Sequence, residues 1–336
     1  MSSVSDEAAV GAAAAGLGAL AQRQVSLAGY TTYRVGGPAS IFVDVADESV
    51  LASVAAVVAA TGVSVLVVGR GSNLLVADTG FLGVALVLGG AFAAVDLPHA
   101  GSVAAGGAPT GESVDQGEGE PVLVVAGAAA SLPVVARRTA AAALTGFEWA
   151  VGVPGSIGGA VRMNAGGHGS DMAETLVRVR VLDLGTGEDG WVPATALELS
   201  YRQSRVGPSQ VVLAAELALH HGDRDQSEAL VADIVGWRRA NQPGGANAGS
   251  VFTNPPGDSA GRLIDAAGCK GLRIGSAEVS SKHANFIQVD GSGRAADVRA
   301  LMVEVARRVE VDLGVRLQAE TRMVGFDDPR RRIEGS

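Results

Sequence analysis

The segment ANAGSVFTNP, residues 246–255, places Ser250 between a glycine and a valine. A serine hydroxyl is a weak acid and, without a base, a weak nucleophile, so Ser250 could be a turn residue or a group that takes part in a reaction. Small residues precede it, and the turn-forming Asn254 and Pro255 follow. A serine before a strand is a common turn residue, because its hydroxyl can bond to nearby backbone. From the residues alone, the turn serine is the favoured interpretation.

Two glycine-rich segments each follow a strand-like run and could hold an anion. The first is GRGSN at 69–73, and the second is GFEWAVGVPGSIGGAVRMNAGGHG at 146–169, with eight glycines in 24 residues. Glycines let backbone N–H groups approach an anion closely. The first loop has neither the dinucleotide fingerprint nor the Walker spacing. Two such loops could clamp a pyrophosphate from both sides, so we predict a pyrophosphate-containing cofactor, with tight turns as the alternative.

Arg202 and Glu320 are two charged residues that could bind a ligand or lie on the surface. Arg202, in SYRQS, is a permanent cation whose planar fork suits a carboxylate. Glu320 lies on the polar side of an alternating stretch and two residues from Arg322. The simpler interpretations are a surface arginine and a Glu–Arg surface pair that contributes about 0–1 kcal/mol.

Regular elements must position these residues. The apolar spacing predicts a β-α-β unit that ends in the first glycine loop, and a strand and a helix that lead into the second. A strictly alternating strand, 315–325, would carry Glu320. A shift in composition near His221 indicates a domain boundary at about 222. The predicted strands are 40–46, 63–69, 122–128, 176–184, 190–205, 211–220 and 315–325, and the predicted helices are 48–62, 132–146, 227–240 and 296–314.

Composition narrows the class of protein. The chain has 336 residues, enough for two or three domains. Its formal net charge of −9 argues against a nucleic-acid or anionic-membrane surface. A single cysteine allows no intrachain disulfide, and the histidine spacing indicates no metal site. We therefore expect a cytoplasmic protein with no metal, membrane or nucleic-acid partner.

Three segments are expected to lie outside the folded domains. Residues 1–26 read as a frayed tail, since Asp6 and Glu7 stand where an export signal would be basic. Residues 91–121 read as an exposed insertion, because they are rich in glycine and acidic residues and show no sustained period. Residues 328–336 read as a second tail.

Seven motifs in order, over most of residues 28–326, resemble the UDP-N-acetylenolpyruvoylglucosamine reductase (MurB) family. They are TTYRVGGPA (31–39), VVGRGSNLLV (67–76), the second glycine segment (146–169), SYRQS (200–204), NAGSVFTNP (247–255), AGRLIDAAGCKGLRIGSAEVSSKHANFI (260–287) and LQAETRMVG (317–325).

The resemblance implies an α+β fold. Residues 27–222 would form an FAD-binding domain of the vanillyl-alcohol-oxidase/PCMH type with two subdomains, and residues 223–327 a C-terminal α/β domain for the UDP-sugar substrate. The first loop offers Ser72 and no histidine, so FAD would be bound non-covalently. The short segment between Arg205 and Ser227 resembles the subgroup without a long substrate loop.

The resemblance also implies a reaction, in which NADPH reduces the enolpyruvyl ether of UDP-N-acetylglucosamine to a lactyl ether. Arg202 and Glu320 would lie at the substrate carboxylate, with Glu320 protonated when it acts, and Ser250 would donate the proton. The partner would be this small molecule, and the protein a monomer or weak oligomer. Alternatives are another FAD-dependent oxidase or dehydrogenase of the same fold, and a nucleotide-sugar sensing module.

Further residues follow from their positions in the motifs. Cations for the UDP pyrophosphate and NADPH stay open, because lysines common in relatives are replaced near Asn241 and at Thr253; Arg202, Arg205, Arg238, Lys270 and Lys282 are the candidates. The predicted substrate-binding residues are Tyr201, Asn254, Lys282, His283 and Asn285. The predicted cofactor-binding residues are Tyr33, Gly69, Arg70, Gly71, Ser72, Asn73, Gly152, Pro154, Gly155, Ser156, Gly158, Gly159, Asn164 and Gly166.

Overall fold

The computed structural model describes residues 2–97, 120–290 and 293–326. Two compact units make up the chain: unit 1 is formed by residues 1–88, 184–187 and 237–336, and unit 2 by residues 89–183 and 188–236. This grouping differs from the single division predicted near residue 222. The N-terminal and C-terminal parts of the chain share unit 1, because strands and caps from both parts bond to each other there.

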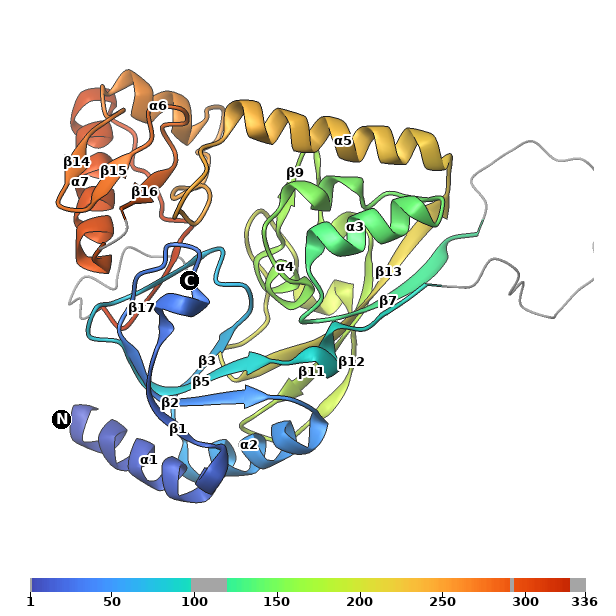
Figure 1. Ribbon diagram of the computed structural model, residues 1–336, viewed down its shortest axis with the longest axis vertical. Coiled ribbons are helices and arrows are strands. Elements are labelled where there is room, and N and C mark those ends of the chain that lie inside the picture. Colours follow the sequence, from blue (N-terminus) through green and yellow to red (C-terminus); the bar gives the residue numbers. More distant parts are fainter. Residues whose placement is uncertain (1, 98–119, 291–292, 327–336) are drawn as a thin grey trace, which may run out of the picture. The chain divides into compact units, whose positions relative to one another are not determined.

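The N-terminal part of unit 1 is a four-stranded sheet covered by two helices (Figure 1). Its strand order is β1-β2-β5-β3, with β2 and β3 parallel to β5 and β1 antiparallel to β2. Asp47 caps the first turn of α2 and the left-handed Gly62 ends that helix, which agrees with the predicted range 48–62. The elements are β1 (Gln22–Ser26), β2 (Pro38–Val45), α2 (Glu48–Thr61), β3 (Val65–Val68), β4 (Leu74–Val76), β5 (Phe81–Leu88) and the short 3-10 helices η1 (Gly18–Leu20) and η2 (Leu27–Tyr30).

The prediction of a frayed tail at residues 1–26 is wrong. Residues 2–17 form helix α1 (Ser2–Leu17), which contacts α2 and β5, and residues 22–26 form β1. Val10, Ala13 and Leu17 are buried. Alanine favours helix, and burial of this apolar stripe stabilises the helix on the sheet.

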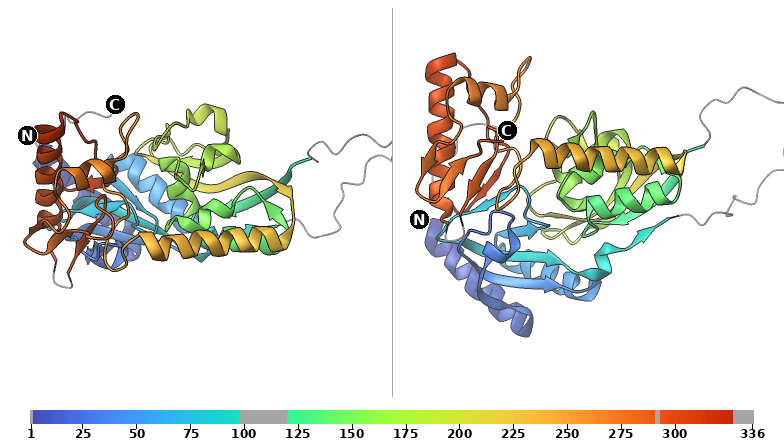
Figure 2. Two further views of the ribbon diagram at one scale, coloured as in Figure 1. Left: turned by 90° about the horizontal axis from the view of Figure 1, so that it is seen from above. Right: turned by 45° about the horizontal axis from the view of Figure 1, so that its top comes forward.

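The C-terminal part of unit 1 packs helix α7 against a small antiparallel sheet, in the order β14-β15-β16 (Figure 2). The chain then returns to the N-terminal part, where β17 pairs with β4 in parallel. The predicted strand 315–325 is therefore regular only in its last third. The elements are α5 (Arg224–Asn241), whose last turn enters unit 1, α6 (Ala260–Ala266), β14 (Arg273–Ile274), β15 (Ala277–Val279), β16 (Ile287–Val289), α7 (Ala295–Leu313) and β17 (Arg322–Val324).

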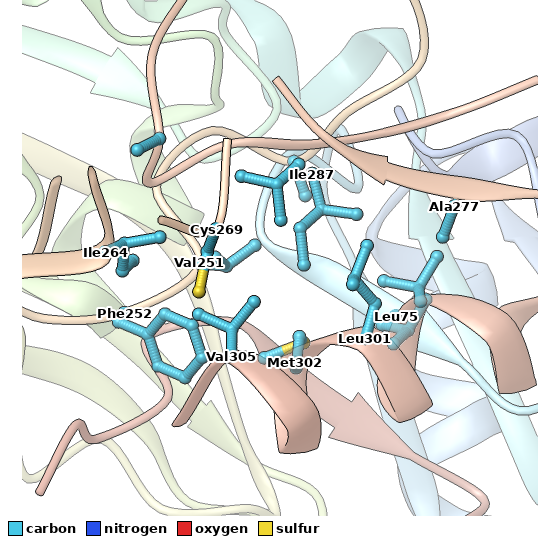
Figure 3. Packing of buried hydrophobic residues seen from close by; sticks show 14 of the residues in the cluster. Leu75, Val251, Phe252, Ile264, Cys269, Ala277, Ile287, Leu301, Met302 and Val305 are labelled. Carbon is cyan, nitrogen blue, oxygen red and sulfur yellow. The ribbon is translucent and has the colours of Figure 1, made fainter. Parts of the chain in front are cut away.

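One buried hydrophobic cluster joins these parts of unit 1 (Figure 3). Leu75 comes from β4, Leu301 and Val305 come from α7, and Val251 and Phe252 come from the segment that follows Ser250. Each of these side chains is at most 3% exposed. The two core residues directly after Ser250 therefore fix the backbone next to it in space.

Unit 2 is built on an antiparallel sheet of order β12-β11-β13-β7-β6, with β8 also paired to β13. Helix α4 packs on β13 and β7. The elements are η3 (Gly90–Ala93), β6 (Val95–Asp96), β7 (Val122–Gly127), α3 (Leu132–Ala141), β8 (Leu144–Thr145), η4 (Glu148–Gly152), α4 (Ile157–Met163), β9 (Gly166–Gly167), β10 (Ser170–Asp171), η5 (Met172–Glu174), β11 (Leu176–Asp183), β12 (Asp189–Pro193), η6 (Ala194–Leu197) and β13 (Gln210–His221).

Two predictions in unit 2 need correction. The predicted strand 190–205 ends at Pro193, because a 3-10 turn and the left-handed Glu198 follow it. The predicted insertion begins too early, since Phe92 and Val95 are buried and β6 pairs with β7. Residues 98–119 of that insertion lie outside the described residues. Among the described residues, no helix is long and apolar enough to cross a membrane.

Candidate functional site

Ser250 lies in an irregular segment that is anchored on its C-terminal side. Gly249 adopts a left-handed conformation with φ of 73°, and its N–H donates to Asn247 Oδ1 at 3.0 Å. The side chains of Val251 and Phe252 are buried in the core, while Ser250 is half-buried. The hydroxyl-bearing residue is thus held at the edge of the core of unit 1.

Glu320 lies on a neighbouring segment that pairs with this one. Its N–H donates to Val251 O at 2.9 Å, and Thr253 N donates to Gln318 O at 2.9 Å. Phe252 and Ala319 form an antiparallel bridge. Backbone pairing therefore brings the segment that follows Ser250 next to the segment that carries Glu320, across 70 positions of sequence.

The first glycine loop is held against residues 30–32. Gly71 has φ of 60°, and its carbonyl accepts hydrogen bonds from Thr32 N at 3.2 Å and Thr32 Oγ1 at 3.3 Å. A Cβ at Gly71 would lie 2.0 Å from Tyr30 O, so only glycine fits. Gly69 and Arg70 stay exposed, which leaves that part of the loop open to a ligand.

Asn73 links this loop to Glu320. Its Nδ2 donates to Glu320 O at 3.1 Å, and its carbonyl accepts from Arg322 N at 3.0 Å. Asn73 is predicted to be a cofactor ligand, but its side-chain amide donates to the backbone carbonyl of Glu320, a predicted catalytic residue. Ser72, the next predicted ligand, is half-buried.

Tyr33 is fully buried beside this link. Burial raises the pKa of Tyr33, while the nearby Thr321 hydroxyl acts in the opposite sense. Within the described residues, neither hydroxyl makes a hydrogen bond of ordinary geometry. A side chain with no exposed surface does not contact a ligand, so the prediction of Tyr33 as a direct cofactor contact is not supported by its position.

The second glycine loop lies in unit 2 and is pinned to residues 128–132. Leu132 N donates to Gly155 O at 3.0 Å, and Ile157 N and Gly158 N donate to Ala130 O and Ala128 O, each at 2.9 Å. Ser156 is buried, whereas Pro154 and Gly159 are exposed. A Cβ at Gly159 would meet only Ser156 Oγ at 3.5 Å, so the surface beside Gly159 is open.

Asn164 and the glycines around it shape the end of this loop. Asn164 is 2% exposed, and its amide makes three hydrogen bonds, to Asp171 Oδ2, to Ser200 O and from Ala173 N. The side chain of this predicted cofactor ligand therefore forms its hydrogen bonds with other parts of the protein. Gly152 and Gly166 are close to other groups, since a Cβ would lie 2.9 Å from the His168 ring and 2.5 Å from Asp171 Cβ, respectively.

Arg202 is anchored to the second loop within unit 2. Its NH2 group donates to Gly166 O at 3.0 Å, and its guanidinium carbon lies 5.1 Å from the Tyr201 ring centroid. Arg202 has φ of 59°, a conformation that is uncommon for a residue with a side chain and that recurs at functional sites. Tyr201 is 52% exposed.

Three predicted substrate residues lie in the C-terminal part of unit 1 with part of their surface accessible. Asn254 is exposed, and its Oδ1 accepts from Ala260 N at 3.0 Å. Lys282 Nζ donates to Arg239 O at 2.5 Å. His283 is half-buried against Phe286, and burial lowers the pKa of His283, so its neutral form is favoured.

Asn285, the last predicted substrate residue, is only 3% exposed. Its amide bonds to the backbone of Phe252 in both directions, and its carbonyl accepts from Val251 N. Its position does not support the predicted direct substrate contact, because both ends of the amide bond to backbone inside the protein.

Asp78 has a structural role that no sequence pattern predicted. Its two carboxylate oxygens accept from Ala295 N at 2.8 Å and Ala296 N at 3.0 Å, which caps α7 from the N-terminal part of the chain. The cap joins residues more than 200 positions apart, so no local pattern in the sequence could have indicated it.

The class of protein follows from the fold and from the loops. A sequence model of the FAD binding domain matches residues 38–189, which include both glycine loops. The exposed glycine surfaces at Gly69 and Gly159 fit a cofactor of this kind. The chain is thus a flavoprotein with an FAD-binding domain.

The family is defined by similarity over nearly the whole chain. The model of the UDP-N-acetylenolpyruvoylglucosamine reductase C-terminal domain matches residues 241–324. UDP-N-acetylenolpyruvoylglucosamine reductase 2 of Symbiobacterium thermophilum is 39% identical over 308 residues, covering 91% of this chain and 92% of its own. The Heliobacterium modesticaldum reductase is 40% identical and covers 90% of each chain.

A solved structure agrees with these relatives. The crystal structure of UDP-N-acetylenolpyruvylglucosamine reductase (MurB) from Thermus caldophilus has a TM-score of 0.73 and 34% identity, over 90% of this chain and 98% of that one. The chain belongs to the UDP-N-acetylenolpyruvoylglucosamine reductase family. The predicted α+β fold and family are confirmed, and the oxidase and sensing-module alternatives are set aside.

Proposed function

We propose that this chain reduces UDP-N-acetylglucosamine enolpyruvate to UDP-N-acetylmuramate in peptidoglycan precursor synthesis, in the cytoplasm, with NADPH as the electron donor and FAD bound non-covalently. The observation that carries the proposal is the pairing of the Ser250 and Glu320 segments, in which Glu320 N donates to Val251 O at 2.9 Å. This pairing joins the segment that follows Ser250 to the segment that carries Glu320, which supports a shared site in a chain of the reductase family.

The reaction breaks one carbon–carbon π bond and forms two C–H bonds. FAD held by the two glycine loops would supply the hydride, which comes from NADPH, for the terminal carbon of the enolpyruvyl group. The displaced electron pair moves into the substrate carboxylate. Arg202 and Glu320 would stabilise the charge there, and the Ser250 O–H would give its proton to the carbon that bears the carboxylate. Solvent then returns a proton to Ser250.

The residues that would hold FAD are those of the two glycine loops that keep an open surface. They are Gly69, Arg70 and Ser72 in unit 1, and Pro154 and Gly159 in unit 2. Arg70 adds a positive charge beside exposed backbone, which suits a pyrophosphate. For the UDP-sugar we propose Tyr201, Asn254, Lys282 and His283.

Arg202 is suited to a carboxylate by its charge and by its fixed position. Gly166 O and the Tyr201 ring hold the guanidinium on the second loop. A side chain that is already oriented loses little conformational freedom when it binds an anion. The left-handed backbone at residue 202 is consistent with a position selected for function rather than for stability.

The test separates the two half-reactions of the Ser250→Ala variant by stopped-flow absorbance of the flavin. Reduction by NADPH should be unchanged, whereas reoxidation by the enolpyruvyl nucleotide under anaerobic conditions should slow by at least about 100-fold, the usual scale for loss of a general acid. Ser281→Ala, an exposed serine in the same unit, is the control. Colourless wild-type protein, or an unaltered reoxidation rate in Ser250→Ala, would contradict the proposal.

A further inference from the structure

Asn285 makes three hydrogen bonds to the two residues that follow Ser250. Its Oδ1 accepts from Phe252 N at 3.0 Å, its Nδ2 donates to Phe252 O at 2.8 Å, and its carbonyl accepts from Val251 N at 2.9 Å. The residue is 3% exposed, so these bonds are sheltered from water. A sheltered amide that satisfies both backbone groups of one residue fixes that residue in place.

We propose that Asn285 is a positioning residue that sets the place of the Ser250 hydroxyl for proton transfer. This inference rests on the proposed function of Ser250. Asn285 acts through the backbone of residues 251–252 and does not touch the substrate.

The chain on the N-terminal side of Ser250 is anchored at two points. Ala246 O accepts from Val289 N at 3.0 Å, and the side chain of Ala248 is buried in the core. The left-handed Gly249 lies between these anchors and Ser250, so the bonds on the C-terminal side act on Ser250 more directly. On that side, Val251 O accepts from Glu320 N. Residues 251–252 are therefore held both by Asn285 and by the segment that carries Glu320.

Asn285 is itself held by a tight turn. Its N–H donates to His283 Nδ1 at 3.2 Å, and Phe286 N donates to His283 O at 3.0 Å. Ser280 Oγ accepts from Lys282 N at 3.2 Å. A fixed turn on one side and a buried amide on the other make residue 285 a rigid support for Ser250.

The first experiment uses the full-length holoenzyme with Asn285→Asp. This change keeps the size and the acceptor for Phe252 N, but the ionised carboxylate cannot donate to Phe252 O. We expect reoxidation by the enolpyruvyl nucleotide to slow about 10- to 100-fold, the scale for a misplaced catalytic group. Reduction by NADPH and the Kd for the nucleotide should change less than about threefold, because neither depends on a proton from Ser250.

A pH profile and a second variant distinguish a positioning role of Asn285 from a purely structural one. The rate of Asn285→Asp relative to wild type should rise as the pH falls, because a protonated carboxyl can again donate to Phe252 O. Asn285→Ser, which can make one of the two bonds, should slow the same half-reaction at all pH values. It also keeps the test valid if the Asp variant does not fold.

The matched control is Asp297→Asn. Asp297 Oδ2 accepts from Ser276 N at 2.9 Å and from Ser276 Oγ at 2.8 Å in the same part of unit 1, and no described hydrogen bond joins it to residues 250–253. This variant should lower Tm without changing either half-reaction.

The double variant Ser250→Ala/Asn285→Asp decides whether Asn285 acts through Ser250. It should be no slower than Ser250→Ala alone. Additive slowing would overturn the proposal, as would a raised nucleotide Kd with an unchanged saturating rate, or equal slowing of both half-reactions. If Ser250→Ala slows reoxidation and neither Asn285 variant does, only this inference fails; if Ser250→Ala does not slow it, the proposed function fails as well.

Discussion

The two glycine loops have a similar composition but different supports. The loop at 69–73 is bonded to distant segments, at Thr32 on one side and at Glu320 and Arg322 on the other. The loop at 152–169 is bonded mainly to residues 128–132 just before it and to Ser200 and Arg202 after it. The first loop therefore helps to fix the backbone of Glu320, and the second loop fixes the side chain of Arg202.

The comparison also separates two uses of glycine. Gly71 is required by the fold, because a Cβ would overlap Tyr30 O at 2.0 Å. Gly159 meets only one side-chain atom, Ser156 Oγ at 3.5 Å, so the fold would accept an alanine there. We infer that Gly159 leaves room for the cofactor, whereas Gly71 allows two backbones to touch.

The largest effect is expected from Gly71→Ala. The new Cβ must displace the backbone at Tyr30 and hold a left-handed conformation, which together should cost about 3 kcal/mol or more of unfolding free energy. Denaturant unfolding measures this loss. FAD content after purification should fall too.

Gly62→Ala is the matched control for that change. Gly62 has φ of 62°, and a Cβ there would meet nothing within 4 Å. It should cost only about 1 kcal/mol, from the left-handed backbone alone. Equal losses for the two variants would show that the contact at Tyr30 is unimportant.

An intermediate effect is expected from Ser227→Ala, which removes a support of the second loop. Ser227 Oγ donates to Glu148 Oε1 at 2.6 Å, and both side chains are buried. Burial alone would raise the pKa of Glu148, but hydrogen bonds from Ser227 and its neighbours outweigh it and lower that pKa from 4.5. Losing one bond to a buried carboxylate should cost about 1–3 kcal/mol.

The unfolding free energy of Ser227→Ala should also depend on pH in a defined direction. Because the folded pKa of Glu148 lies below its unfolded value, its stabilisation is present above pH 4.5 and is lost as the pH falls through the folded pKa. Ser227→Ala should raise the folded pKa, so the unfolding free energy of the variant should fall less steeply with acid than that of wild type. Ser53→Ala, a helical serine bonded to Ser49 O, should show neither change.

The smallest effect on the fold is expected from Gly159→Ala. Alanine in helix α4 should leave the unfolding free energy of the apoprotein unchanged or raise it by about 0.5 kcal/mol. FAD affinity should nevertheless fall about tenfold, because the methyl group would occupy the open surface. Titration of apoprotein with FAD measures it; an unchanged affinity would contradict the assignment of this loop surface to the cofactor.

Local patterns predicted much of the fold. Apolar spacing and the terminal Gly62 predicted α2 accurately, and the periodicity of α7 was equally clear, because these elements bury one regular stripe. Helix α1 was missed because its low-complexity alanine sequence resembles a tail, and only its burial on α2 and β5 makes it a stable element. The strand at 315–325 was overestimated, since alternation continues where the chain makes only one bridge.

The site was predictable at the level of motifs but not of contacts. The motifs identified Ser250 and Glu320, and the structure pairs their segments. They could not distinguish Asn285 and Asn164, whose amides bond to protein backbone, from residues that meet a ligand. The residue type is the same in both roles, and only the burial of the asparagine and its hydrogen-bond partners distinguish them.

The account rests on the claim that Ser250, Glu320 and Arg202 act on one substrate. The most direct measurement is a crystal structure of the FAD-bound protein with the enolpyruvyl nucleotide. We predict Ser250 Oγ at about 3–3.5 Å from the carbon that bears the carboxylate, with Glu320 and Arg202 at the carboxylate oxygens. A Ser250 hydroxyl turned away from that carbon, or a carboxylate bound by other residues, would contradict the account.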